Sequence, residues 1–418
     1  MIKAAIALVF CLSAGLLAAQ NRPPAPPGQQ RPPRQLDADR YSIQQATSDQ
    51  AQLHTIAFDG LAYLTGDFAA DTFLPPGKVS DYFGFQYMRD IDAAEGGHNT
   101  SFLTRIADNM LAVLDDAQKA KLVALAGRQQ ADIRRFAQMR LPLIAAFRRN
   151  LEGNAPAGTA LSRQAVMRYS ASLYELDGKL AFDRARSTAE VLRSLTPAQR
   201  AALAKLKFGD SRTWPDIAEQ LDRRSMSHED DVAVMTYASE MFSWYAGSLE
   251  ADTYFCPERH GMYFGGFGMK TLPAMGKQNY SISTALTGDS GEAFLQVLND
   301  SQRKLVTGIL DQQKSDLAEI VTTRRAISTE LRRFLDGGQG DEAKVLALSR
   351  RYGELDGEMS YLYATAFAAV GKSLTAAQKQ TLNGMRVNDP NDVQGPFLYS
   401  TPIRDPQIAN TDFLFAAR

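Results

Sequence analysis

The chain has 418 residues, of which 46 are lysine or arginine and 47 are aspartate or glutamate, so its formal net charge at pH 7 is −1. This balance excludes the strong basic excess with which proteins commonly hold nucleic acid or an anionic membrane as their main partner. The length suffices for two domains with hydrophobic cores of their own. The expected partners are therefore proteins or peptides, further copies of the chain included, and no nucleic acid.

The first 19 residues are typical of a secretory signal peptide. Lys3 precedes an apolar run at residues 6–17, and small residues end the segment. The run is shorter than the roughly 20 residues of a membrane span, and no later stretch is apolar enough, so no transmembrane segment is predicted. We expect an exported protein that is periplasmic, in a bacterial envelope, or secreted. Cleavage would remove Cys11 and leave Cys256 as the only thiol.

A proline-rich linker is predicted at residues 20–40, because proline fixes φ and removes a hydrogen-bond donor. Beyond the linker the chain contains itself twice. Asp71-Thr72-Phe73 returns as Asp252-Thr253-Tyr254, 181 positions later (252 minus 71), and neighbouring motifs return at the same distance. We therefore predict helical repeat 1 at residues 41–224, helical repeat 2 at 225–388 and an extended C-terminal tail at 389–418.

Helical periodicity dominates both repeats, with apolar residues recurring at helical spacing along each long segment. The predicted helices cover residues 50–64, 116–150, 166–192, 231–245, 300–335 and 342–370. Gly- and Pro-containing turns at residues 154–158 and 337–340 separate the long ones. The predicted fold class is all-α, with two tandem copies of a long antiparallel helical-hairpin unit and irregular aromatic, Gly- and Pro-rich loops.

Four short elements begin alike, each with a leucine, a capping residue and a glutamine three positions after the cap. They are Leu114-Asp115-Asp116-Ala117-Gln118, Leu195-Thr196-Pro197-Ala198-Gln199, Leu298-Asn299-Asp300-Ser301-Gln302 and Leu374-Thr375-Ala376-Ala377-Gln378. The capping side chain accepts a bond from the first helical turn, the glutamine reaches back to the cap, and the leucine forms a hydrophobic staple. All four elements are therefore predicted helix starts.

Leu-Thr-x-x-Gln before a long amphipathic helix, as at residues 195–199 and 374–378, resembles the hallmark of the Spy/CpxP-type periplasmic proteins. That family includes zinc-resistance-associated and nickel/cobalt-sensing relatives. The resemblance covers the caps and the hairpins between them, but not the aromatic loops or the tail. It implies an all-α exported protein that acts as an ATP-independent chaperone, an envelope-stress inhibitor or a metal-linked sensor. The chain is longer than typical members, so it would be a distant, internally duplicated one.

Charged residues also recur within the two hairpins. They are Asp132, Arg140 and Asp177, which match Asp316, Arg324 and Asp356, and the pair Arg148-Arg149, which matches Arg332-Arg333. A metal-binding carboxylate set is one interpretation, but neither hairpin has the histidine that a di-metal bundle normally brings. We interpret them as structural charge pairs, an aspartate and an arginine bridging the two arms. Gly178 and Gly357 cost about 1 kcal/mol each within a helix, which predicts a close helix crossing.

The loops at residues 71–99 and 252–279 are rich in glycine, proline and aromatic residues, and are too long for plain connections. The aromatic and methionine residues that they share are Tyr82, Phe83, Met88, Tyr263, Phe264 and Met269. These side chains form either the core of an irregular segment or an apolar groove for a client protein.

One stretch occurs in repeat 2 only. Its Cys256, His260 and Met262 are soft ligands suited to copper or zinc. A structural zinc site would have four clear ligands, so the signal is weak. An inter-chain disulfide through Cys256 and an inert buried thiol are the alternatives. No cofactor is firmly predicted, and copper or zinc is the candidate metal.

No nucleophile, catalytic base or phosphate-binding loop occurs in a recognisable setting, so the chain is not predicted to be an enzyme. The leading hypothesis is an exported helical protein that binds proteins or peptides, as a chaperone or envelope-stress factor. The second is a periplasmic metal-binding or metal-sensing protein that uses Cys256 and His260. The third is a structural or assembly subunit of the cell envelope, in which the aromatic tail, with Phe413-Leu414-Phe415, makes chain–chain contacts.

Overall fold

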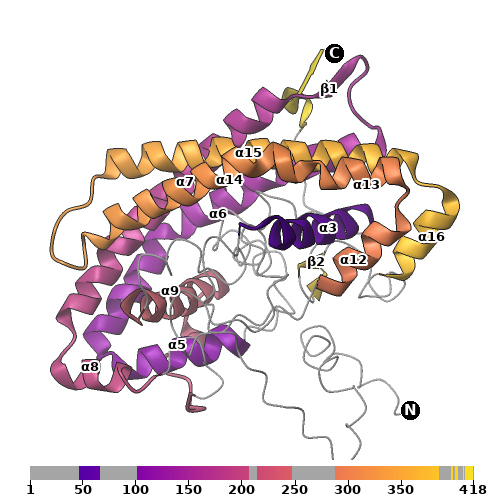
Figure 1. Ribbon diagram of the computed structural model, residues 1–418. Helices are drawn as coiled ribbons and strands as arrows, with labels where there is room; N and C mark the ends of the chain where they lie inside the picture. The colour runs from indigo at the N-terminus through magenta and orange to yellow at the C-terminus, as the bar shows by residue number, and fades with distance from the viewer. Residues whose placement is uncertain are drawn as a thin grey trace, which may run out of the picture.

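Figure 1 shows the computed structural model of the chain, which is mostly helical with almost no strands, as the sequence predicts. The structure describes residues 47–65, 101–206, 214–246, 288–385, 397–398, 401–402, 408, 410 and 411–417. Within these ranges no helix has the length and apolar character needed to cross a membrane.

Long helices alternate with short ones along the chain. The helices of the first half are α3 (Asp49–Thr65), α5 (Ser101–Val113), α6 (Asp116–Glu152), α7 (Arg163–Ser194) and α8 (Pro197–Leu203). Those of the second half are α9 (His228–Ala246), α12 (Gly288–Val297), α13 (Asp300–Thr307), α14 (Ile309–Arg332), α15 (Glu342–Ser373) and α16 (Ala376–Gly384), with 3-10 turns η3 (Arg223–Ser225) and η4 (Asp412–Leu414). The single helix predicted at residues 300–335 is interrupted at Gly308, where glycine weakens the helix.

Two short antiparallel strand pairs complete the fold. β1 (Thr159–Leu161), in the turn between α6 and α7, pairs with β4 (Phe415–Ala417) near the C-terminus. β2 (Phe397–Leu398) pairs with β3 (Thr401–Pro402). The strand in the first hairpin turn was not predicted, because three residues are too few to show the two-residue period of a strand.

The crossing of α7 and α15 is close because small residues meet there. A β-carbon at Gly353 would lie 2.6 Å from the carbonyl oxygen of Ser170, and one at Gly357 would lie 2.8 Å from Ser170 Cβ. In the reciprocal position, a β-carbon at Gly178 would collide with the side chain of Ser349. The predicted close crossing at Gly178 and Gly357 is confirmed. Gly357 of α15 faces Ser170 of α7, and the matching Gly178 of α7 faces the matching Ser349 of α15.

The short helices are exchanged between the two halves. α9 packs on α5, α6 and α7 of the first half, whereas α3 packs on α12, α13 and α15 of the second half. In Figure 1 the resulting pairs, α3 with α12 and α5 with α9, lie below the long helices. Tyr237 and Met241 of α9 belong to one hydrophobic core, and Ile56 and Leu61 of α3 belong to a second core. Each hairpin is therefore covered by a helix that the other half supplies.

All four predicted helix starts are confirmed as capping boxes. The caps are Asp115, Thr196, Asn299 and Thr375. In each one the cap side chain accepts from the backbone amide of the glutamine, whose side chain accepts from the backbone amide of the cap. Local sequence alone is sufficient for this geometry, since cap and glutamine are three positions apart.

The capping glutamines also bind one another in pairs. Gln199 Nε2 donates to Gln118 Oε1 at 2.7 Å, and Gln378 Nε2 donates to Gln302 Oε1 at 2.7 Å. Each donor also reaches a backbone carbonyl at the end of α5 or α12. The start of the first hairpin arm is thereby tied to the short helix that follows the second arm, which closes the open end of each hairpin.

Gly353→Ala should lower the free energy of unfolding by about 1–3 kcal/mol, because its methyl group would overpack against the backbone of α7. Gly127→Ala is the matched control, since a β-carbon at Gly127 in α6 would meet nothing within 4 Å. The control should gain up to about 1 kcal/mol from better helix propensity. Urea denaturation measures both changes. A stabilised Gly353→Ala protein would contradict the close crossing.

Gln302→Ala should cost about 1–3 kcal/mol of unfolding free energy, because it removes the acceptor of a part-buried amide. A cycle with Gln378→Ala should show a coupling of at least about 0.5 kcal/mol, as expected for residues in direct contact. Gln164→Ala, at an exposed position of α7, is the control and should change stability by less than about 0.5 kcal/mol. Additive effects of the Gln302 and Gln378 substitutions would show that the hydrogen bond between these two glutamines does not stabilise the protein.

Candidate functional site

The residues predicted for a client groove and for a metal site lie outside the described residues. They are Tyr82, Phe83, Met88, Tyr263, Phe264 and Met269 for the groove, and Cys256, His260 and Met262 for the metal. Among the residues that the structure does describe, no group of three His, Cys, Asp or Glu side chains could hold a metal ion. The helices on either side fix where the two aromatic segments, residues 66–100 and 247–287, begin and end.

Because of the exchange of helices, both aromatic segments run between the same two helix pairs. Residues 66–100 follow α3 and precede α5, and residues 247–287 follow α9 and precede α12. Because α3 packs on α12 and α5 packs on α9, each segment leaves one of these helix pairs and re-enters at the other. The two aromatic segments therefore connect the same two helix pairs, in opposite chain directions.

An arginine holds the end of each helix from which an aromatic segment departs. Arg148 of α6 lies over the ring of Tyr63, 5.3 Å from its centroid, and donates to the Tyr63 carbonyl at 3.5 Å. Arg332 of α14 lies over the ring of Trp244 at 5.9 Å and donates to the Trp244 carbonyl at 3.2 Å. Cation–π contact and hydrogen bond together fix the helix end.

The sequence showed that these arginines recur, but not which aromatic residues they contact. The partners lie 85 and 88 positions away along the chain. Only tertiary packing brings them together.

Buried amide side chains fasten the exchanged helices to the hairpins. Tyr237 of α9 donates to Gln129 Oε1 of α6 at 2.8 Å. Gln313 of α14 donates to Gln52 of α3 at 2.9 Å and accepts from the Tyr363 hydroxyl at 2.7 Å. The sequence interpretation missed Gln129 and Gln313. The signal that could have found them is their recurrence at matching positions on the apolar face of the two first arms.

Tyr363 is a hydrogen-bond donor at neutral pH. Its burial, together with the nearby carboxylate of Asp59 and that of Asp356, raises its pKa well above the ordinary value of 10.0, although the bond to Gln313 opposes this. The hydroxyl therefore keeps its proton and holds the Gln313 amide in the orientation that reaches α3. This buried cluster is an anchor for the exchanged helix.

Asp132 and Asp316 occupy matching positions but have different surroundings. Asp132 pairs with Lys179 on the opposite arm at 2.9 Å, so its partner is a lysine and not the predicted arginine. At the position matching Lys179 the second hairpin carries Glu358, which pairs with Arg163 of α7. Burial and then the like charge of Glu358 raise the pKa of Asp316 above 3.8, against nearby arginines that lower it.

The other predicted charge-pair residues lie deeper between the long helices. Arg140 and Asp356 are fully buried, with 1% and 0% of their surface exposed. Arg324 is buried with its guanidinium carbon 5.8 Å from the centroid of the Tyr352 ring, and Asp177 is half-buried. These positions suit a structural role in the packing of the hairpins.

No known family model matches the chain, and neither does any curated protein or solved structure. The resemblance to the Spy/CpxP-type proteins therefore stays a prediction.

Asp316→Asn should raise the free energy of unfolding at pH 7, by less than about 1 kcal/mol because solvent screens the half-exposed carboxylate. Its raised folded-state pKa means that the folded protein loses stability as pH rises through that pKa. The gain from asparagine should therefore vanish below the ordinary pKa of 3.8. Asp132→Asn is the matched control and should destabilise at pH 7, because it breaks the pair with Lys179. Urea denaturation at several pH values tests both variants. If both substitutions change the free energy of unfolding at pH 7 in the same direction, the different surroundings of Asp132 and Asp316 are refuted.

Proposed function

We propose that the chain is an exported, non-enzymatic helical protein that binds unfolded proteins or peptides, as a chaperone or envelope-stress factor. The observation that carries the proposal is that both aromatic segments run between the same two helix pairs. Side chains from both segments can then contribute to one apolar client groove, whose members are Tyr82, Phe83, Met88, Tyr263, Phe264 and Met269. An unfolded protein exposes apolar side chains, and these can bind to an apolar groove of this kind.

We also infer that the helical frame arose by tandem duplication of one hairpin unit. Three sets of matched contacts support this inference: the four capping boxes, the reciprocal glycine–serine contacts between α7 and α15, and the two arginine clamps. Duplication would supply two similar aromatic segments on one rigid frame. The signal-like first 19 residues support export.

The purified mature protein should suppress the aggregation of a chemically denatured client at near-stoichiometric ratio, as measured by light scattering. Replacing Tyr82 and Phe83 by serine should weaken suppression, and so should replacing Tyr263 and Phe264. The combined variant should lose most of the effect, because apolar contact area contributes about 25 cal/mol per Å² to binding.

Leu305→Ser is the matched control for these substitutions. Leu305 is an exposed apolar side chain on α13, with 42% of its surface accessible, and lies outside both aromatic segments. Its replacement should leave suppression unchanged. If the unmodified protein fails to suppress aggregation at stoichiometric excess, the proposed function is wrong.

A further inference from the structure

The turn of the first hairpin holds an extended segment from the far end of the chain. β4 adds to β1 as an antiparallel strand, with Leu161 opposite Phe415 and Thr159 opposite Ala417. The Ser162 amide donates to the carbonyl of Leu414 at 2.8 Å. Backbone pairing of this kind is strand addition, a mode by which folded proteins bind extended peptides.

Side chains of α6 and α7 read the sequence of that segment. Arg149 Nη1 donates to Asp412 Oδ1 and to Thr411 Oγ1, each at 2.8 Å, and its guanidinium carbon lies 5.1 Å from the centroid of the Phe415 ring. The same arginine is positioned by a bond from Nε to the carbonyl of Asn154 at 3.1 Å. One side chain therefore recognises an acidic residue and an aromatic residue three positions later.

Apolar contacts complete the recognition. Leu414 is fully buried in the core that also contains Leu161 and Val166. The ring of Phe413 lies 5.4 Å from that of Tyr169, centroid to centroid, while 54% of the Phe413 surface stays exposed. The segment is thus held by one buried leucine and one ion pair, flanked by two aromatic contacts.

The contacts of this segment belong to the tip of the first hairpin. β4 and η4 pack on β1, α6 and α7. In the second hairpin the arginine that matches Arg149 is Arg333, and it pairs with its neighbour Glu330 at 2.9 Å. Within the described residues, no strand occupies the turn between α14 and α15. The arrangement is therefore particular to the first hairpin.

We propose that the tip of the first hairpin is a peptide-binding site, which receives by strand addition an extended partner segment with an acidic, an aromatic, a leucine and an aromatic residue in that order. The chain's own Asp412-Phe413-Leu414-Phe415 is the resident ligand and competes with the partner. The site is separate from the aromatic segments. Its occupant is a protein segment with the chemistry of the tail, because Arg149 pairs with the acidic residue and the core around Leu161 and Val166 buries the leucine.

The test uses the full chain with Leu414→Asp and Phe415→Ala, which detaches the tail, and a fluorescent peptide of residues 408–417. Hydrogen exchange at residues 159–161 confirms detachment. The peptide should bind this tail variant saturably in fluorescence anisotropy. It should bind the unmodified chain at least about tenfold more weakly, because the tethered tail competes at high effective concentration.

Charge reversal then tests the recognition. Arg149→Asp in the tail variant should lower its affinity for the peptide by about tenfold or more, because a charge-assisted hydrogen bond is lost. A peptide with Asp412→Arg should bind this Arg149→Asp variant more tightly than the original peptide does. Arg333→Asp is the matched control and should change nothing.

Three results would overturn the proposal: no saturable binding to the tail variant, affinity indifferent to Arg149, or tail exchange between copies. Exchange would appear as an inter-chain disulfide when Ala160→Cys and Ala416→Cys chains are mixed in a Cys256→Ser background, since these two residues face each other across β1 and β4. Retained aggregation suppression by the Arg149→Asp variant separates failure here from failure of the proposed function.

Discussion

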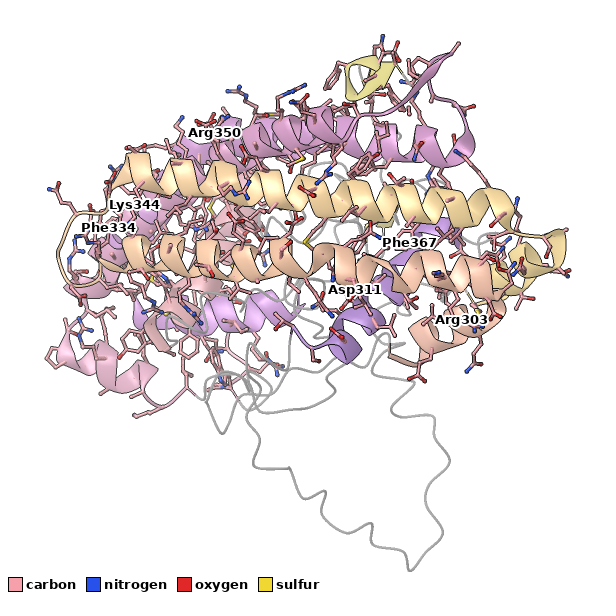
Figure 2. The ribbon with its side chains drawn as sticks, turned by 45° about the horizontal axis from the view of Figure 1, so that its top comes forward. Arg303, Asp311, Phe334, Lys344, Arg350 and Phe367 are labelled. Atoms are coloured by element: carbon pink, nitrogen blue, oxygen red, sulfur yellow. The ribbon has the colours of Figure 1, made fainter. Side chains whose placement is uncertain are left out.

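The close crossing of α7 and α15 is the constraint on which the rest of the structure depends. Close approaches that leave no room for a β-carbon at Gly178, Gly353 or Gly357 bring the two hairpins together along their return arms. Because the hairpins are joined in this way, α3 can reach the second half and α9 can reach the first half. Figure 2 shows α14 and α15 side by side, with Phe334 and Lys344 near the turn that joins them.

The exchange of α3 and α9 adds a second connection between the two halves. Each exchanged helix is fastened by a buried amide contact, from Gln52 to Gln313 or from Tyr237 to Gln129. An arginine then holds the helix end from which an aromatic segment departs. A single half would lack the helix that covers its own core. We therefore infer that the two aromatic segments run between the same two helix pairs because the frame itself requires both halves.

Departures from the matched pattern show where the halves have different tasks. Lys179 of the first hairpin neutralises Asp132, whereas Glu358 leaves Asp316 beside a like charge and takes its own partner from α7. Arg149 binds the tail, whereas Arg333 binds a neighbour on its own helix. The described contacts of the second hairpin are packing contacts with other helices, whereas the first hairpin also binds the C-terminal strand β4. Side chains can differ between the halves at these places because neither the glycine crossing of α7 and α15 nor the paired capping glutamines involve them.

The sequence by itself determined the features that depend on nearby residues: the long helices, all four capping boxes, and the need for small residues at Gly178 and Gly357. Helical periodicity and a cap three residues from its glutamine are local, so no distant partner is needed to recognise them. Tertiary structure decided the choice of partners. The exchange of α3 and α9, the aromatic contacts of Arg148 and Arg332, the lysine partner of Asp132 and the strand pairing of the tail join residues far apart in the chain. Many partners would satisfy the same charge or apolar surface, and only the packing of the whole frame selects among them.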